Sequence, residues 1–417
     1  MARRLKIGVF GAFRGMSMIK VLARHPQAEL TAICDKARDL LDGCAKESVL
    51  HDQKIALYES FDEFLKHDLD AVVLANYANE HAPFAIRVLD SGRHVLSEVL
   101  PVETLSQAVA LVEAVERNGK VYAYAENYCY FPATMEMRKL YRSGRLGEFL
   151  HGEGEYIHDC ESIWPSITYG ERDHWRNRLY STYYCTHSLG PLLHITGNRP
   201  VRVTGYETPN VPNMAKYGFR GGTSGMIVLQ MDNKAVVKSL HGYLKREPSA
   251  IWYSLYGTKG MMETDRWDGG IERLNVFEEG STTTETATSY RPKPVADSTL
   301  ARETAGHGGS DFYPVHFFLK KILGESGGDE SIDVYEALDM AIPGILAYKS
   351  ILNGNIPYEV PDFRKKETRA AYRNDHFCTN PDIAGTQLAP QCSFGVPDIP
   401  DAVYGDVRKT WEEKSRH

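Results

Sequence analysis

Short apolar runs alternate with amphipathic stretches over the first 125 residues. The apolar runs lie at residues 7–10, 30–34, 71–75, 95–96 and 121–125. Helical patterns fall between them, near residues 16–25, 61–67, 80–91 and 104–118. Short strands that are apolar throughout and separated by helices indicate a parallel sheet covered on both faces. The pattern therefore predicts an α/β Rossmann domain over residues 1–127.

The pattern changes after about residue 130. A helical stretch near 134–143 leads to a long strand-like run at 149–159. Further strand candidates lie near residues 200–207, 224–231, 234–243, 250–257 and 260–265. Their close spacing and the intervening turn residues predict an α+β domain over residues 128–357, with a large, mainly antiparallel open sheet. Residues 358–417 are rich in Pro, Asp and Lys with weak periodicity, which predicts an extended C-terminal tail.

Composition narrows the classes of partner. The chain has 417 residues, a net charge of −7 and a sequence pI near 6.1, which argues against nucleic acid or a membrane surface as partner. No run approaches 18 apolar residues, and the N-terminus lacks a signal-peptide pattern, so we expect a cytoplasmic protein. Seven scattered cysteines without a C-x-x-C pair argue against a disulfide framework or a structural zinc site. Histidines and carboxylates form no compact metal motif, so no metal is expected.

A glycine-containing turn follows the first predicted strand. Residues 8–15 read Gly-Val-Phe-Gly-Ala-Phe-Arg-Gly and lead into a helix. Glycine at such a turn lets the backbone approach a pyrophosphate at the positive helix N-terminus. The G-x-G-x-x-G pattern is broken, because Phe13 occupies the place of the second glycine and Gly15 implies a loop one residue shorter. A tight structural turn without a ligand is the alternative.

Asp35 strengthens the prediction of a dinucleotide site. It ends the second strand 24 residues after Gly11, where a carboxylate can accept hydrogen bonds from the ribose hydroxyls. The same charge would repel a 2′-phosphate, so NAD is favoured over NADP, although Lys36 and Arg38 stand close enough to soften this preference. The alternative is that Asp35 caps the next helix.

A family resemblance rests first on residues 91–101, Ser-Gly-Arg-His-Val-Leu-Ser-Glu-Val-Leu-Pro. This stretch resembles the G-K-H-V-L-x-E-K-P signature of the Gfo/Idh/MocA oxidoreductases, and the resemblance extends over roughly residues 5–355. Val99 stands in place of the signature's lysine, often the proton-handling residue, and Leu100 precedes the proline. Valine cannot exchange a proton, so another residue must do that work.

Four further stretches resemble glycoside hydrolase family 109, a branch that holds NAD tightly and also lacks the lysine. They are residues 126–130, 153–158, 184–191 and 306–312. The resemblance implies His187 and Tyr156 as proton-transfer residues, and imidazole is available as a base near neutral pH. Glu126 would orient sugar hydroxyls or act through its charge. The alternatives are a structural histidine, a packing tyrosine and a capping glutamate.

The resemblance also implies the ligand contacts. Substrate contacts are expected from Tyr184, Arg176, His307 and Asp311, although an acid in a first helical turn often only complements the helix dipole. Cofactor contacts are expected from Gly8, Gly11, Phe13, Arg14, Gly15, Asp35, Asn76, His81 and Glu98.

These observations predict an NAD-dependent enzyme that oxidises a hydroxyl of a small-molecule sugar or glycoside, expected at C3. The first alternative is a redox-neutral glycosidase, in which oxidation, elimination, water addition and reduction recycle the cofactor. The second is a non-catalytic NAD- or sugar-binding regulator. By analogy with sheets of this kind, a homo-oligomer, either a dimer or a tetramer, is expected.

Overall fold

The computed structural model describes residues 3–51, 53–267, 270–280, 288–293, 298–304 and 306–415. The chain divides into two compact units, each of which is described by itself. The first unit combines Met1–Pro132, Lys293–Leu338 and Phe363–Asn374, and the second combines Ala133–Pro292, Asp339–Asp362 and Asp375–His417. The domain boundaries after residues 127 and 357 stay a prediction.

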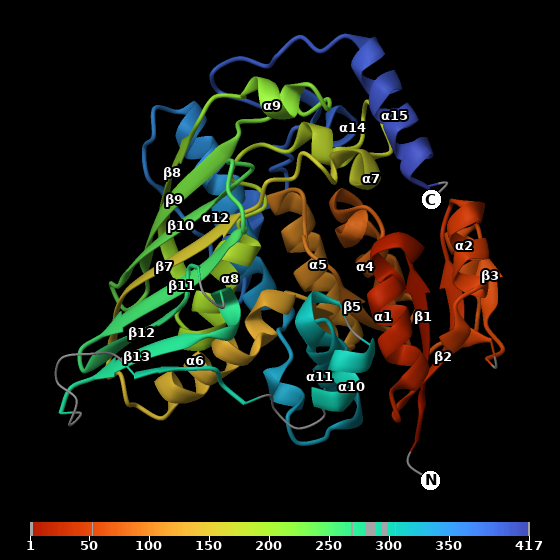
Figure 1. The fold of residues 1–417 in the computed structure, drawn as a ribbon, viewed down its shortest axis with the longest axis horizontal. Helices are drawn as coiled ribbons and strands as arrows, with labels where there is room; N and C mark the ends of the chain where they lie inside the picture. Colours follow the sequence, from red (N-terminus) through yellow and green to blue (C-terminus); the bar gives the residue numbers. More distant parts are fainter. Residues whose placement is uncertain are drawn as a thin grey trace. The chain divides into compact units, whose positions relative to one another are not determined.

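The first unit contains a six-stranded parallel sheet in the order β3-β2-β1-β4-β5-β6. Figure 1 labels β1, β2, β3 and β5 of this sheet. Its strands are β1 (Leu5–Phe10), β2 (Ala28–Cys34), β3 (Ala56–Tyr58), β4 (Ala71–Leu74), β5 (His94–Ser97) and β6 (Tyr122–Tyr124). All four residues of β4 are buried, because helices cover both faces of a parallel sheet. The strand order reverses beside β1, where this class of fold binds its ligand. The predicted Rossmann domain is confirmed.

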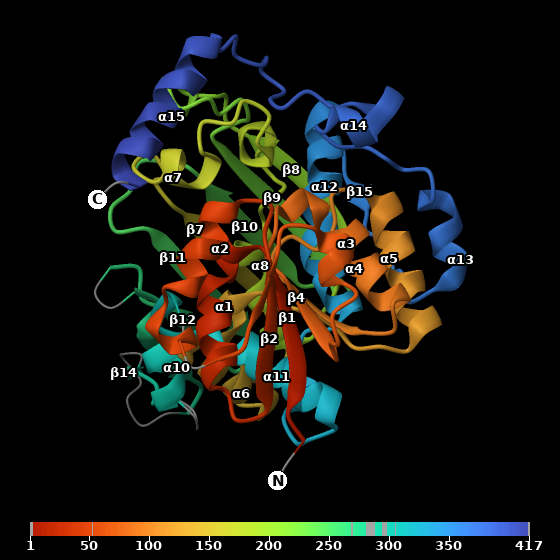
Figure 2. The ribbon, with the colours of Figure 1, turned by 90° about the vertical axis from the view of Figure 1, so that its right-hand side faces the viewer.

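Helices connect these strands and extend the first unit. They are α1 (Ala12–Arg24), α2 (Arg38–Ala45), α3 (Phe61–Phe64), α4 (His81–Asp90), α5 (Leu105–Asn118), α10 (Ser298–Thr304), α11 (Phe312–Leu323) and α13 (Lys366–Arg369). The chain-distant helices α10 and α11 pack against α1. Figure 2 shows α13 beside α5, where Arg369 forms an ion pair of 2.5 Å with Glu116.

The second unit contains a nine-stranded sheet in the order β14-β13-β12-β11-β7-β10-β9-β8-β15. The strands are β7 (Phe149–Ile157), β8 (Pro200–Glu207), β9 (Ser224–Met231), β10 (Val236–Gly242), β11 (Ala250–Gly257), β12 (Gly260–Thr264), β13 (Leu274–Glu278), β14 (Thr288–Tyr290) and β15 (Tyr358–Glu359). Strands β7 and β10 are parallel and the other pairs are antiparallel. This confirms the predicted, mainly antiparallel sheet.

The helices of the second unit are α6 (Pro132–Arg142), α7 (Trp164–Thr168), α8 (Thr186–Thr196), α9 (Pro212–Ala215), α12 (Val334–Leu352, in this unit from Asp339 on), α14 (Pro381–Ala384) and α15 (Asp401–Ser415). Of these, α7, α8, α9 and α12 lie between strands of the sheet in the sequence, whereas α6 precedes the sheet and α14 and α15 follow it. Helix α8 packs on β7, β10 and β11. The tail predicted as extended carries the fifteen-residue helix α15. Among the helices of the described residues, none has the length and apolar character needed to span a membrane.

Candidate active site

The glycine turn of the first unit is built so closely that only glycine fits at its tip. Gly11 has φ of 98°, and a Cβ there would lie 2.3 Å from the main-chain carbon of Ala75. At Gly15 a Cβ would lie 2.9 Å from Cγ1 of Val9, so this glycine lets α1 lie close on β1. Such a turn leaves a cradle in which the backbone can meet a pyrophosphate at the start of α1.

Two other predicted cofactor residues take different places. Gly8 lies inside β1, where a Cβ would meet the ring of Phe64 at 2.5 Å, so its smallness serves packing within the sheet. Phe13 lies in the first turn of α1 and is 48% exposed. Its ring takes the place of the missing second glycine at a surface that a ligand can reach.

Asp35 faces the glycine turn from the end of β2. Its carboxylate accepts hydrogen bonds from the backbone N–H groups of Ala12, at 2.7 Å, and of Ala37, at 2.8 Å. The two neighbouring cations are engaged elsewhere. Lys36 lies over the ring of Tyr77, and Arg38 pairs with Asp42 at 3.0 Å and with Glu59 at 3.4 Å. Neither Lys36 nor Arg38 is therefore directed at the Asp35 carboxylate, which favours NAD over NADP.

Asn76 and His81 follow the end of β4. The side-chain oxygen of Asn76 is buried and makes no hydrogen bond with the described residues, so it is available to a ligand. His81 lies 2.9 Å from the Leu100 carbonyl oxygen and 3.2 Å from that of Asn76. Burial lowers the pKa of His81 to about 4, so the ring is neutral and donates to one carbonyl at a time.

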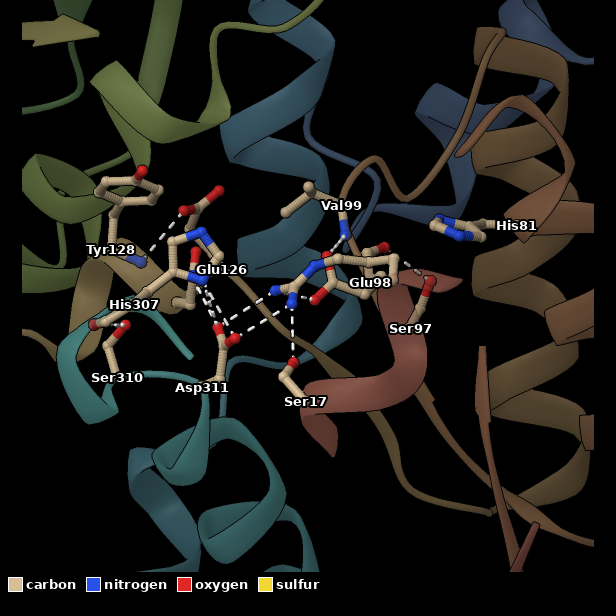
Figure 3. A network of polar contacts seen from close by, with 12 residues as sticks. Ser17, His81, Ser97, Glu98, Val99, Glu126, Tyr128, His307, Ser310 and Asp311 are labelled. Carbon is tan, nitrogen blue, oxygen red and sulfur yellow. Dashed lines mark hydrogen bonds and ion pairs between the residues drawn. The ribbon is translucent and has the colours of Figure 1, made fainter. Parts of the chain in front are cut away.

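Ser17, Glu98 and Asp311 belong to a polar network in the first unit (Figure 3), and Arg14 connects them. Its guanidinium lies 2.7 Å from Glu98, at the end of β5, and 3.0 Å from Asp311. It also donates to the Ser17 hydroxyl at 2.8 Å. Figure 3 shows Val99 beside Glu98, with His81 further from the Asp311 end of the network. The predicted residues Arg14, Glu98 and Asp311 are therefore brought together.

Asp311 is fully buried and saturated with donors. Its carboxylate accepts from Arg14, from Asn127 at 2.8 Å and from Nδ1 of His307 at 3.0 Å. Burial alone would raise the pKa of Asp311, but the contacts with His307 and Arg14 outweigh it and hold the pKa below its usual range. Because Nδ1 of His307 faces Asp311, Nε2 is the ring nitrogen left for a ligand.

Glu126 is buried at the end of β6 and begins a short 3-10 helix. One carboxylate oxygen accepts from the backbone N–H of Tyr128 at 3.3 Å, and the Tyr128 ring lies 6.3 Å from that of His307. Figure 3 shows Glu126, Tyr128 and His307 together at one end of the network. Glu126 therefore has the capping contact weighed as its structural alternative, and it also lies among predicted ligand contacts.

In the second unit, glycines in β7 allow the start of α8 to lie directly on the strand. A Cβ on Gly154 would be 1.7 Å from the carbonyl oxygen of Ser188, and a Cβ on Gly152 would be 3.4 Å from Leu192. Glycine inside a strand is typical of such close backbone approach. The next residue on this face of β7 is Tyr156, and His187 lies in the first turn of α8, so the approach brings these two side chains together.

His187 lies between two tyrosine rings. Its ring centroid is 4.9 Å from that of Tyr156 and 5.0 Å from that of Tyr184, both in edge-on arrangements. The side chain is buried, with 6% exposure, and its main-chain carbonyl accepts the Tyr253 hydroxyl at 2.5 Å. The imidazole is thus held at a fixed helix start, within an environment of aromatic faces and hydroxyls.

Arg176 completes this cluster from the 3-10 helix at 175–178. Its guanidinium lies 4.3 Å from the ring centroid of Trp175 and 5.8 Å from that of Tyr184. The Trp175 and Tyr184 rings stack 6.4 Å apart. Four of the predicted residues, Tyr156, Arg176, Tyr184 and His187, are therefore neighbours in the second unit.

His241 is a neighbour that the sequence did not single out. It lies on β10, paired in register with Tyr156 of β7, and it is buried. Neither of its ring nitrogens makes a hydrogen bond with the described residues. Burial lowers its pKa to about 3, with a further lowering from nearby His187, so the ring is neutral. A lone histidine in a strand gives no sequence signal, because only the register places it beside Tyr156.

Other residues near the cluster have local partners. His158 stacks on Tyr156 at 6.2 Å, and its Nδ1 lies 2.8 Å from Sγ of Cys160, whose pKa burial raises to about 12. Asp159 pairs with Lys245 at 3.0 Å. Within the ranges that the structure describes, no three His, Cys, Asp or Glu residues are grouped as metal ligands. The sequence had not indicated Ser17, Asn127 or Trp175 as site residues. Ser17 and Asn127 are identified by their hydrogen bonds with Arg14 and Asp311, and Trp175 by its contacts with Arg176 and Tyr184.

Two family models match the chain. The model described as "Glycosyl hydrolase 109, C-terminal domain" matches residues 130–372. The model described as "Oxidoreductase family, NAD-binding Rossmann fold" matches residues 5–126. NAD is therefore the cofactor of the first unit, in agreement with the Gly11 cradle and the unsatisfied oxygen of Asn76.

Relatives of known family match most of the chain. A "Glycosyl hydrolase family 109 protein" of Solibacter usitatus is 28% identical over 399 residues, which cover 87% of this chain and 88% of the relative. "Glycosyl hydrolase family 109 protein 1" of Phocaeicola vulgatus is 26% identical over 407 residues, with coverage of 87% and 84%.

Solved structures share the fold. Levoglucosan dehydrogenase, in complex with NADH and levoglucosan, matches with a TM-score of 0.68 at 18% identity, covering 86% of this chain and 100% of that chain. The WlbA dehydrogenase from Bordetella pertussis, in complex with NADH and UDP-GlcNAcA, has a TM-score of 0.67 at 18% identity, with coverage of 87% and 99%.

Proposed function

The chain belongs to the family defined by the glycosyl hydrolase 109 C-terminal domain, and from that premise we propose that His187 and Tyr156 carry proton transfer in the oxidation of a sugar or glycoside hydroxyl, expected at C3. The observation that carries the proposal is the buried imidazole of His187 between the rings of Tyr156 and Tyr184. Aromatic faces suit the C–H surfaces of a sugar, and the tyrosine hydroxyls suit its polar edge.

His187 is the proposed base. Oxidation of an alcohol requires removal of the hydroxyl proton along the path on which hydride leaves the carbon. The Tyr253 hydroxyl holds the His187 carbonyl, so the base is fixed by the first turn of α8. Tyr156 is the second proton-transfer residue, and the neutral ring of His241 is available for a hydrogen bond to a hydroxyl or to water.

The first unit holds NAD, which when bound accepts the hydride from the sugar carbon. Asp35 is proposed to accept from the ribose hydroxyls, and Asn76 to use its unsatisfied oxygen as a further contact. Arg14, fixed by Glu98 and Asp311, would place a cationic group in the first turn of α1, where the pyrophosphate charge needs support. His81 keeps its place between two carbonyl groups and is proposed to order the Asn76 loop.

The remaining predicted residues are proposed to contact the sugar. Arg176 and Tyr184 would donate to its hydroxyls from the aromatic cluster. His307 would use Nε2, since Asp311 occupies Nδ1, and Asp311 would act by orienting it. Glu126 is proposed to orient sugar hydroxyls or to act through its charge, while its capping contact fixes the side chain.

The match of residues 130–372 to the family 109 domain favours a second candidate, a redox-neutral glycosidase. A C3 ketone acidifies the hydrogen on C2, so a modest base such as Tyr156 or His187 can remove it while the C1 substituent leaves. Addition of water and return of the hydride would complete hydrolysis. Both candidates use the same cluster for the first step and differ in net product.

The test is a panel of p-nitrophenyl glycosides and free sugars, with the absorbance of NADH and of nitrophenolate followed together in one sample. Lasting NADH formation supports the dehydrogenase. Nitrophenolate release without lasting NADH supports the glycosidase and contradicts the net dehydrogenase. Sugar binding with no product in either channel, in wild type and in His187→Ala alike, would favour a non-catalytic regulator.

We also propose a homo-oligomer, dimer or tetramer, in the cytoplasm. The face of the second sheet opposite α8 exposes large side chains, namely those of Tyr206, Val236, Tyr256 and Phe277, which supports self-association through this face. The seven free cysteines, all buried, suit a reducing compartment. Light scattering of wild type and of Tyr256→Lys tests the first proposal, and a monomeric wild type would contradict it; fractionation of cells tests the second.

A further inference from the structure

The end of the chain lies beyond the matched family domain and is packed onto the second unit. The family model ends at residue 372, whereas the second unit takes in Asp375–His417. In α15 the apolar residues Tyr404, Val407 and Trp411 recur at helical spacing. Figures 1 and 2 both show α15 beside α7, and the two helices are in contact.

Helix α15 packs against Tyr169 and Gly170, which directly follow α7. The Trp411 ring meets the Tyr169 ring edge-on at 5.3 Å. At Gly170, a Cβ would lie 2.5 Å from the backbone nitrogen of Arg408 and 2.6 Å from the carbonyl oxygen of Tyr404, so the two backbones touch at a glycine with φ of 67°. Contact this close between two main chains indicates a built interface.

A second contact of the C-terminal segment lies at Arg178, eight residues after Gly170. The Thr379 hydroxyl donates to the carbonyl oxygen of Arg178 at 2.7 Å, and the Arg178 guanidinium donates to the side-chain oxygen of Asn380 at 3.4 Å. The C-terminal segment thus holds both ends of residues 169–178. Trp175 and Arg176, the outer members of the proposed sugar cluster, lie between these two contacts.

An unbroken series of ring contacts connects Tyr169, which Trp411 contacts, to the proposed base His187. The Tyr169 ring meets that of His174 at 6.0 Å, and His174 meets Trp175 at 5.9 Å. Trp175 stacks on Tyr184 at 6.4 Å, and Tyr184 meets the ring of His187. Displacement of Trp411 can therefore shift the side chains of the sugar cluster, because the intervening rings are packed against one another.

We propose that residues 375–415 form a brace that positions the Trp175–Arg176 wall for sugar binding, with Trp411 as its principal positioning residue. The proposal rests on the proposed function of the cluster. The brace acts on substrate binding and leaves the NAD site of the first unit unchanged. Proton transfer at His187 changes little, because the Tyr253 hydroxyl and the contact of Gly154 with Ser188 hold the start of α8 independently of Trp411. The brace lies outside the matched family domain, which ends at residue 372.

The test uses the full chain and three variants: Trp411→Ala, Trp411→Phe and, as a matched control, Lys409→Ala at an exposed position of the same helix. One readout is the rate of tryptic cleavage after Arg172, Arg176 or Arg178, identified by mass spectrometry, which needs no turnover. The other is KM and kcat for a p-nitrophenyl glycoside that wild type turns over, together with the NAD content of the purified protein.

The brace predicts that Trp411→Ala is cleaved in this segment about 10-fold faster, through local opening, and that its KM rises about 10-fold while kcat changes less than about 2-fold. Trp411→Phe, which keeps an aromatic ring, should restore both values, and Lys409→Ala should match wild type.

Equal cleavage rates and KM values for Trp411→Ala and Lys409→Ala would overturn the brace. Faster cleavage with an unchanged KM would overturn its role in sugar binding, and loss of NAD would overturn its restriction to the substrate. If wild type turned over none of the probes, the proposed function would fail, while the cleavage rates would still decide whether the brace exists.

Discussion

The close approach of β7 and α8 can be tested by adding a single methyl group. In Gly154→Ala the new Cβ would lie 1.7 Å from the Ser188 carbonyl oxygen, whereas ordinary contacts begin at 3.4 Å. The backbone of α8 must therefore retreat by roughly 1.7 Å, because the atom it meets belongs to the main chain and cannot rotate away. His187 lies one residue before Ser188 and must move with it.

The expected cost follows from this displacement. Misplacement of a catalytic group by about 1 Å lowers the rate on the order of 100-fold, so we expect kcat to fall by about that factor. Forcing an extra methyl group into a packed site also costs about 1–3 kcal/mol of stability. NAD content should be unchanged, because the cofactor belongs to the first unit.

Gly152→Ala is the matched control for this prediction. It adds the same methyl group on the same face of the same strand, but its Cβ meets the side chains of Phe149, at 3.1 Å, and Leu192, at 3.4 Å. These side chains can give way, so kcat should fall by less than about 5-fold. The assay is steady-state kinetics with the NADH and nitrophenolate signals, alongside thermal unfolding. Equal kcat values for the two variants would refute the reasoning that backbone contact fixes His187.

Three further changes test other parts of the account. Asp35→Ala would remove the proposed charge-assisted hydrogen bonds to the ribose, so NAD should bind about 10- to 100-fold more weakly and the NAD-to-NADP preference should shrink, as titration calorimetry would show. An unchanged preference would contradict the proposed role of Asp35. Asp311→Asn should cost roughly 2 kcal/mol near neutral pH, because Arg14 loses one of its two buried carboxylate partners and keeps Glu98. Since the folded pKa of Asp311 is lowered, this contribution is fully present above the unfolded pKa of about 3.9 and is lost progressively as the pH falls from there towards the lower folded pKa. Urea unfolding should therefore show the difference between the two proteins shrinking below about pH 3.9, and a constant difference would contradict the ion pair. Gly405→Ala places a Cβ in open space within α15 and should raise stability by about 0.5–1 kcal/mol in thermal unfolding, whereas a loss would show that the helix is not formed there.

Five of the six strands in the first unit, namely β1, β2, β4, β5 and β6, could be read from the sequence because buried parallel strands are largely apolar. Strand β4, with all four residues buried, is the plainest case. The three-residue strand β3 and the order of the strands were not predicted. The sequence could not reveal that residues 293–338 and 363–374 join this unit, since their contacts with α1 and α5 depend on tertiary packing alone. Helix α15 was not predicted because charged residues and a glycine are interspersed among its apolar residues.

The site was predicted as separate residues, and the structure supplies their proximity. The resemblance named His187 and Tyr156, but Gly154 explains why they meet, and a glycine within a strand was the readable sign. His241 could not have been predicted, because the residues next to it in the sequence do not reveal the strand register that pairs it with Tyr156. Asp311 was expected at the sugar, and the saturation of its carboxylate by Arg14, Asn127 and His307 became visible only from the contacts.

The central claim is that hydride passes from a sugar carbon to the bound cofactor with His187 as the base. The most direct measurement uses a substrate from the panel carrying deuterium at C3, mixed with the NAD-loaded protein and quenched within a single turnover, with the nicotinamide analysed by mass spectrometry. The account predicts deuterium on the nicotinamide ring in wild type and none in His187→Ala, although both proteins retain NAD. Product formation in wild type with a nicotinamide that never gains deuterium would contradict it.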